Sequence, residues 1–124
     1  MAGLPPIISI ITPTYNRADE LVHLYESLKK QTVDLKLFEF IISDDGSTDI
    51  TQSMVEEWQF NSPFKIKFIS QKNQGPGAAR NHGLDIAEGE LILFIDSDCE
   101  AHPDWIQTIY EEYLNDSFDA CGGP

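Results

Sequence analysis

Apolar residues along the chain form short runs that alternate with longer stretches of helical spacing. Residues 7–11 form a β-branched run that predicts a strand buried on both faces. Residues 38–43 and 91–95 predict two further strands, and the 91–95 run, which is the most apolar, predicts the centre of a sheet. Residues 64–70 alternate between apolar and polar side chains, which predicts a strand at the edge of the sheet.

The segments after the first two strands have the pattern of amphipathic helices. Residues 19–30 begin with two acids and end with two lysines, which matches the helix dipole. The apolar positions of this helix follow an i, i+3, i+4, i+7 spacing and are Leu21, Leu24, Tyr25 and Leu28. The apolar face of the second helix is formed by Ile50, Met54 and Trp58. Ser47 or Thr48 is its predicted N-cap.

Two more helices follow the third and fourth strands. In the third helix, Pro76 occupies the first position and Gly89 is the predicted stop signal. Its inner positions are small and so predict close packing on a sheet or a ligand: Ala78, Ala79, Gly83 and Ala87. Pro103 begins the last helix, and residues 118–124 are a candidate for the start of a fifth strand.

Strands and helices therefore alternate along the whole chain, which predicts an α/β fold. Short connections between them favour a Rossmann-like, parallel, doubly wound sheet of four to five strands with helices on both faces. Residues 1–124 form one expected domain. In such a sheet, ligands bind beyond the carboxyl ends of the strands. The segments after the first, second and fourth strands are therefore expected to meet at one edge.

The charge of the chain limits the ligands that it can bind. Eight basic and 21 acidic residues give a formal charge of −13, which argues against nucleic acid and anionic lipid as partners. An anionic ligand would need a local source of positive charge, such as a metal ion or a helix N-terminus. No apolar run approaches the roughly 20 residues that a transmembrane helix needs, and no signal peptide is recognisable, so we expect a cytoplasmic domain. Cys99 and Cys121 are accordingly expected to be reduced.

Two carboxylates, Asp96 and Asp98, come directly after the most apolar strand. In extended backbone, side chains at i and i+2 point to the same side. Two carboxylates on one side suit a hard cation such as Mg²⁺ or Mn²⁺, which completes its coordination shell with water and phosphate oxygens. The alternative is an ordinary turn before the last helix, with Asp98 as a solvated or capping acid.

The segment "TPTYNR" follows the first strand and offers three kinds of ligand contact. Tyr15 can stack on a base, Asn16 can hydrogen-bond to it, and Arg17 can pair with phosphate. An ordinary loop between strand and helix, with Asn16 near the N-cap, explains the same residues equally well.

Two other segments are candidates for ligand contacts. In "DDGSTD", Asp44 could accept a hydrogen bond from a base N–H, although the sequence is also good turn and N-cap chemistry. Residues 75–80 could offer backbone N–H groups to phosphate at a helix start, although they match neither a P-loop nor a G-x-G-x-x-G finger. Arg80 lies in this region, and an exposed helical arginine is the alternative.

In this order, "ISIITPTYNR", "FIISDDGSTD", "NQGPGAARNHGLDIAEGE" and "LILFIDSDCE" resemble successive motifs of the family 2 glycosyltransferases, which are inverting enzymes with the GT-A fold. The resemblance covers about residues 7–124. It implies a nucleotide-binding group that consists of Pro13, Tyr15, Asn16, Arg17, Asp44, Gly75, Ala79, Arg80 and Asp96. In this group Asp44 would contact the base, which is uracil in many members. Asp96 and Asp98 match the D-x-D motif, which holds the ribose and a Mn²⁺ or Mg²⁺ ion.

The resemblance also implies an activity. A sugar would pass from a nucleotide-diphosphate donor, expected to be a UDP-sugar, to a glycan, lipid or protein acceptor in cell-wall or polysaccharide biosynthesis. Inversion requires a general base, which this family carries on its C-terminal half. We therefore expect a nucleotide-sugar-binding portion that lacks the acceptor half, and we assign no catalytic base to this chain.

Two other classes of protein share some of these features. A non-catalytic nucleotide-binding or interaction domain would have the same strand-end pattern. A haloacid-dehalogenase-type phosphatase also places D-x-D at a strand end. That motif normally follows the first strand, which is followed here by "TPTYN", and Glu100 occupies the place of its Thr or Val.

Overall fold

A computed structural model of the chain describes residues 5–115. In chain order its main elements are β1 (Ile8–Thr14), α1 (Ala18–Lys29), β2 (Phe38–Asp44), α2 (Thr51–Asn61), β3 (Lys65–Ser70), α3 (Pro76–Ile86), β4 (Leu91–Phe94) and α4 (Trp105–Leu114). A short 3₁₀ helix, η1 (Leu35–Leu37), comes before β2. The predicted alternation of strands and helices is confirmed, and the predicted fifth strand lies outside the described residues.

The four strands form one parallel sheet in the order β3-β2-β1-β4. The α/β class and the edge position of β3 are thus confirmed. The predicted central position of β4 is wrong, because within residues 5–115 this strand pairs only with β1 and its side chains are half-buried or exposed. The hydrophobicity of a strand does not determine how many strands pair with it.

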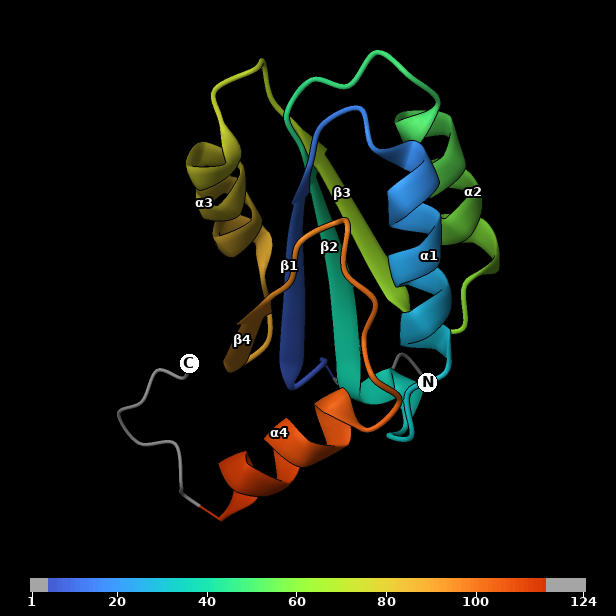
Figure 1. Cartoon of the computed structure of the whole chain (residues 1–124). Coiled ribbons are helices and arrows are strands. Elements are labelled where there is room, and N and C mark those ends of the chain that lie inside the picture. The colour runs from blue at the N-terminus through green and yellow to red at the C-terminus, as the bar shows by residue number, and fades with distance from the viewer. Residues whose placement is uncertain (1–4, 116–124) are drawn as a thin grey trace.

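Helices cover both faces of the sheet, with α1 and α2 on one face and α3 on the other (Figure 1). Ile8, Ile10 and Phe40 belong to the main hydrophobic core, which also includes buried residues of α1 and α2. The alternate positions of the same strands pack against α3, as expected from the two-residue period of a strand. A Cβ atom on Gly83 would lie 2.6 Å from Cγ2 of Ile11, which confirms that small residues let α3 lie close to the sheet.

Strand β1 is longer than the sequence predicts, because it continues through Pro13 to Thr14. Proline cannot donate to a ladder and is tolerated where a strand lacks a neighbour on one side. The pairing of β1 with β4 ends at Ile11 and Phe94, so Pro13 has a partner only in β2. The extension carries the chain to the edge of the sheet at which the loops meet.

Two predicted helix boundaries are wrong. Helix α2 begins at Thr51, later than a cap at Ser47 or Thr48 would place it. The carboxylate of Asp49 accepts hydrogen bonds from both the backbone N–H and the hydroxyl of Thr51. The short polar side chains before Asp49 instead take part in the loop that ends β2.

Gly89 is not the stop signal of α3, because this helix ends at Ile86 and Ala87 has extended backbone angles. Gly89 must be a glycine for a different reason, because a side chain would not fit at this position. A Cβ atom on Gly89 would lie 2.7 Å from both N and Oγ of Ser9 and 2.8 Å from O of Ile7. The backbone N–H of Gly89 also donates to the Ser9 hydroxyl over 2.8 Å. Gly89 therefore sets how closely the α3–β4 connection approaches β1.

We expect Gly89→Ala to lower the free energy of unfolding by about 1–3 kcal/mol, as is typical of overpacking. Two of the three contacts are with backbone atoms at the start of β1 and just before it, which cannot move without disturbing the sheet. Urea unfolding followed by circular dichroism measures this loss. Gly77→Ala is a matched control, because a Cβ there would meet no atom within 4 Å, and its stability should stay at or above that of the parent chain. Equal stability of the two variants would contradict this packing argument.

Candidate functional site

A cavity of about 380 Å³ lies beyond the carboxyl ends of the strands. It is lined by Pro13, Thr14, Tyr15, Arg17, Glu20, Asp45, Pro76, Arg80, Asp96, Ser97 and Asp98. The connections after β1, β2, β3 and β4 all contribute residues, so the strand-end segments meet as the α/β topology predicts. Among the predicted site residues, those that line the cavity are Pro13, Tyr15, Arg17, Arg80, Asp96 and Asp98.

Strand β4 ends at Phe94, two residues before the first acid of the D-S-D segment. The N–H of Ile95 still donates to O of Ile11 over 3.1 Å. The carbonyl of Ile95 then accepts a hydrogen bond from the Thr12 hydroxyl over 2.9 Å. A side chain of β1 therefore fixes the point at which the chain leaves the sheet.

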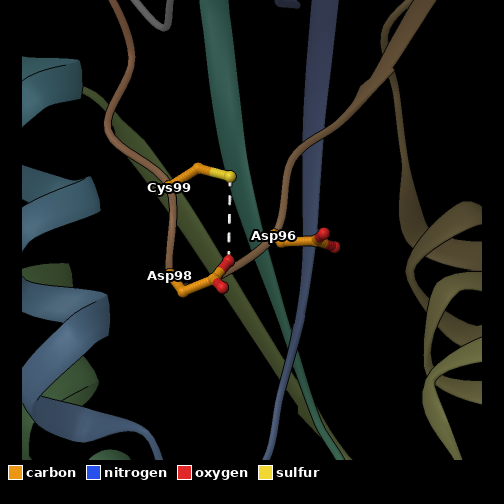
Figure 2. A group of neighbouring side chains, drawn as sticks. All are labelled: Asp96, Asp98 and Cys99. Atoms are coloured by element: carbon orange, nitrogen blue, oxygen red, sulfur yellow. Dashed lines mark hydrogen bonds between the residues drawn. The ribbon is translucent and has the colours of Figure 1, made fainter.

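Asp96 and Asp98 lie in a turn, in which the N–H of Cys99 donates to O of Asp96 over 3.1 Å. The predicted extended backbone at these two acids is therefore wrong. Aspartate and serine favour turns, and the D-S-D segment forms one. The two acidic side chains nevertheless point to the same side, toward α3 (Figure 2). One ligand atom from each of Asp96, Asp98 and Cys99 lies within 4.8 Å of the others.

The chemistry of these side chains fits a hard divalent cation. Asp96 and Asp98 are exposed, so their oxygens are open to an ion that keeps several waters. Burial, the Asp98 carboxylate and other nearby groups raise the pKa of the Cys99 thiol above its usual 9.0. Soft thiolate ligands favour ions such as Zn²⁺, whereas hard ions such as Mg²⁺ and Mn²⁺ favour carboxylates, so the two carboxylates are the relevant pair. Cys99 is a free cysteine, as expected, and Cys121 lies outside the described residues.

The cavity also contains two arginines, and each lies beside an acid. Nη2 of Arg80 is 3.6 Å from Oδ1 of Asp96, and Nη1 of Arg17 is 3.7 Å from Oε1 of Glu20. Exposed pairs of this kind contribute little to stability, on the order of 0–1 kcal/mol. Both guanidinium groups can therefore exchange these partners for an anionic ligand at small cost.

The two acids that end β2 have different surroundings. Asp44 is buried, and its carboxylate accepts hydrogen bonds from the N–H groups of Gly46 and Ser47 and from the Ser47 hydroxyl. It therefore organises its own loop and does not line the cavity. Asp45 lines the cavity, although sequence reasoning gave it no role.

The carboxylate of Asp45 joins the β2–α2 loop to the start of α3. It accepts hydrogen bonds from Nε2 of Gln71 at 2.6 Å, N of Gln74 at 2.7 Å and N of Gly75 at 3.0 Å. Burial raises the pKa of Asp45, but these three hydrogen bonds outweigh it and hold the pKa below the usual 3.8. Asp45 is thus an ionised group in the cavity wall at neutral pH.

Asp45→Asn should lower the free energy of unfolding at pH 7 by about 1.5–3 kcal/mol, the usual contribution of a hydrogen bond to a charged group. The folded-state pKa lies below the unfolded value of 3.8. The contribution of Asp45 is therefore fully present above that value and is lost as the pH falls through the folded-state pKa. Urea unfolding at pH 7, 5 and 3 should show the difference between parent and variant shrinking only at the lowest pH. A difference that is independent of pH would contradict an ionised Asp45.

Asn16 connects the loops after β1 and β2 and does not line the cavity. Its Oδ1 accepts from N of Thr48 over 2.8 Å, and its own N–H donates to Oγ of Ser47 over 2.7 Å. Its φ angle of 53° lies in the left-handed region, which asparagine adopts more readily than most residues. Asn16 thus fixes the relative positions of two loops that border the cavity.

Gly75 and Ala79 also lie outside the cavity lining. The φ angle of Gly75 is 99°, which favours glycine, and its N–H already donates to Asp45. Ala79 is fully buried, and its carbonyl accepts from the Ser43 hydroxyl over 2.6 Å. Both residues therefore help to hold α3 in place against the sheet.

Five cavity-lining residues were not predicted to be site residues, namely Thr14, Glu20, Asp45, Pro76 and Ser97. Two of them carried a usable signal. Asp45 directly follows the last residue of a strand whose end faces the site, and Ser97 lies between the two acids. Within residues 5–115, no helix combines the length and the apolar character needed to cross a bilayer.

Comparisons with known proteins identify the family of the chain. The family described as "Glycosyl transferase family 2" matches residues 9–124. Validoxylamine A glucosyltransferase of Streptomyces hygroscopicus subsp. jinggangensis is 37% identical over 84% of this chain and 25% of its own length. Crystal structures of Staphylococcus aureus TarS 1-349 in complex with UDP and with UDP-GlcNAc are 34% and 35% identical, with TM-scores of 0.82 and 0.76.

Each TarS structure matches 89% of this chain. The match covers 32% and 31% of the respective TarS chains. The chain therefore spans about a quarter to a third of the length of these relatives. The family match covers residues 9–124, and it favours a sugar transferase over the phosphatase alternative.

Proposed function

The chain belongs to glycosyl transferase family 2, and from that membership we propose that its cavity binds the nucleotide-diphosphate part of a UDP-sugar donor. The observation that carries the proposal is a cavity of about 380 Å³ in which two exposed carboxylates and two arginines face the same space. The TarS structures in complex with UDP and UDP-GlcNAc support the choice of donor. The activity of the whole protein would be transfer of the sugar to an acceptor with inversion at the anomeric carbon.

Asp96 and Asp98 would hold a Mn²⁺ or Mg²⁺ ion in this cavity. When bound, the ion supplies Lewis-acid stabilisation of the charge that develops on the diphosphate leaving group. Such an ion also explains how a chain with a formal charge of −13 binds a dianionic or trianionic ligand.

The side chains around Asp96 and Asp98 would contact other parts of the nucleotide. The exposed ring of Tyr15 stacks on the base, and Asp45, as an ionised acceptor, takes a hydrogen bond from a base N–H. Arg17 and Arg80 contact the diphosphate, and Pro13 forms part of the wall behind it.

Asn16, Asp44, Gly75 and Ala79 would support nucleotide binding indirectly. Their polar groups already make hydrogen bonds within the protein, and these bonds fix the loops that carry the lining residues. We therefore treat them as residues that shape the cavity, and Asp45 replaces Asp44 as the proposed base contact.

Inversion also needs a general base that takes the proton of the acceptor hydroxyl. We propose that this base and the acceptor site lie in a portion of the parent protein beyond this chain, which spans about a third or less of its relatives. The acceptor would be a glycan, a lipid or a protein, as in cell-wall or polysaccharide biosynthesis. By itself, the chain would bind the donor without turnover.

Calorimetric titration with UDP tests the proposal. With MnCl₂ present, UDP should bind at least about tenfold more tightly than in EDTA, which corresponds to about 1.4 kcal/mol. GDP under the same conditions should bind more weakly, because the larger purine does not match a uracil site. No UDP binding in either buffer would overturn the proposal. Metal-independent binding would instead favour a nucleotide-binding domain that has no metal site.

A further inference from the structure

The ion pair between Arg80 and Asp96 joins two groups that have different partners in the proposed complex. Arg80 projects from α3, and Asp96 lies in the turn after β4 and points toward α3 (Figure 2). The exposed fractions of their side chains are 39% and 65%, so the pair faces the cavity and a ligand can reach it. The guanidinium, 3.6 Å from Oδ1 of Asp96, pairs with an oxygen that a cation would also use.

Two positive charges beside Asp96 would repel each other. A divalent cation held by Asp96 would lie within a few ångströms of the Arg80 guanidinium, where like charges repel even in a partly solvated cavity. Arg17, the other arginine of the cavity, is paired with Glu20 and not with Asp96 or Asp98. The competition with a cation is therefore specific to Arg80 among the cavity-lining residues.

We propose that Arg80 competes with the divalent cation for Asp96 until a nucleoside diphosphate draws the guanidinium away, so that nucleotide and metal bind cooperatively. This inference rests on the proposed donor and metal site and adds a coupling residue to it. Arg80 is thus a positioning residue for the metal, acting through the position of its guanidinium. A bound diphosphate offers the guanidinium two or more acceptor oxygens, which is a better partner than one exposed carboxylate.

The coupling has a reciprocal form that can be measured. If UDP increases the affinity for Mn²⁺ by some factor, Mn²⁺ increases the affinity for UDP by the same factor. Removal of the Arg80 charge should tighten Mn²⁺ binding in the absence of nucleotide by about two- to fivefold, the scale of an exposed ion pair. The same change should weaken UDP binding in EDTA, because a cation of the cavity is lost.

The experiment measures Mn²⁺ binding to the whole chain by the electron paramagnetic resonance signal of free Mn²⁺, with and without UDP. Arg80→Gln is compared with Arg17→Gln, which removes the same charge from the same cavity but not from beside Asp96. Both variants should weaken UDP binding in EDTA, and only Arg80→Gln should tighten Mn²⁺ binding without nucleotide. Circular dichroism melting confirms that both variants are folded.

Each outcome has a defined meaning. A twofold or larger tightening that is confined to Arg80→Gln, together with a smaller effect of UDP on Mn²⁺ affinity, supports the coupling. Equal Mn²⁺ affinity in the parent chain and Arg80→Gln overturns the coupling while the donor site stands, provided that UDP still binds. Equal tightening in both variants also overturns it, because general cavity charge would then be the cause. A parent chain that binds neither Mn²⁺ nor UDP would overturn the donor site and the coupling together.

Discussion

Replacing Lys67 with methionine will lower the free energy of unfolding by about 3 kcal/mol, at the lower end of the cost of breaking a buried ion pair. Glu39 is fully buried on the α3 face of β2, and Nζ of Lys67 lies 3.0 Å from its Oε1. The other carboxylate oxygen accepts from the Ser9 hydroxyl at 2.7 Å and from N of Glu88 at 2.8 Å. Without Lys67, the Glu39 carboxylate is buried beside no cation. The Lys67 side chain is 20% exposed, which lets some water reach the site and keeps the cost near the lower end.

Lys65→Met is the matched control, because Lys65 is on the same strand but pairs with Glu88 at the surface, where both side chains are about half exposed. Lys65→Met should lower the free energy of unfolding by no more than about 1 kcal/mol. The double variant Glu39→Gln/Lys67→Met should recover part of the stability, since it removes both charges. Urea unfolding at pH 7 measures all three variants. Equal losses for Lys67→Met and Lys65→Met would show that burial of Glu39 does not determine the cost.

The double variant Asp96→Asn/Asp98→Asn will abolish the strengthening of UDP binding by Mn²⁺, a loss of at least about tenfold in affinity, or 1.4 kcal/mol. An amide oxygen carries no charge and holds a hard cation far more weakly than a carboxylate. The stability of the fold should hardly change, because both side chains are exposed. Calorimetric titration with UDP in MnCl₂ and in EDTA measures the effect.

Glu56→Gln/Glu57→Gln is the control for net charge, since it removes two exposed acids from α2, none of whose residues line the cavity. It should keep the full effect of Mn²⁺ on UDP binding. If the Asp96→Asn/Asp98→Asn variant kept the same effect, the metal would have to be bound elsewhere.

The sequence predicted the elements of the fold because local patterns determine them. Helix α1 begins and ends within a few residues of its acidic and basic ends, and all four of its predicted apolar positions are buried. The order of the strands could not be predicted in the same way. The apolar run of β4 fits a central or an edge position equally well, and hydrogen-bonded pairing with β1 decides between them.

The candidate site was predictable at the level of segments and less so at the level of residues. The rule for strand ends brought Tyr15, Arg17, Arg80 and the D-S-D acids to one cavity. Asp44 is hydrogen-bonded to Ser47 within its own loop, whereas the role of Asp45 depends on hydrogen bonds to Gln74 and Gly75, about 30 residues away in the chain. Such contacts leave no periodic pattern in the sequence.

The central claim is that UDP and a divalent cation bind together at the carboxyl ends of the strands. Its most direct test is a crystal structure of the chain grown with UDP and MnCl₂, with data collected to give an anomalous signal from manganese. The account predicts one anomalous peak within about 2.5 Å of a carboxylate oxygen of Asp96 or Asp98, with the diphosphate of UDP bound to the same ion. An ion or a nucleotide bound only outside the cavity of Pro13, Asp45, Arg80 and the D-S-D turn would contradict it.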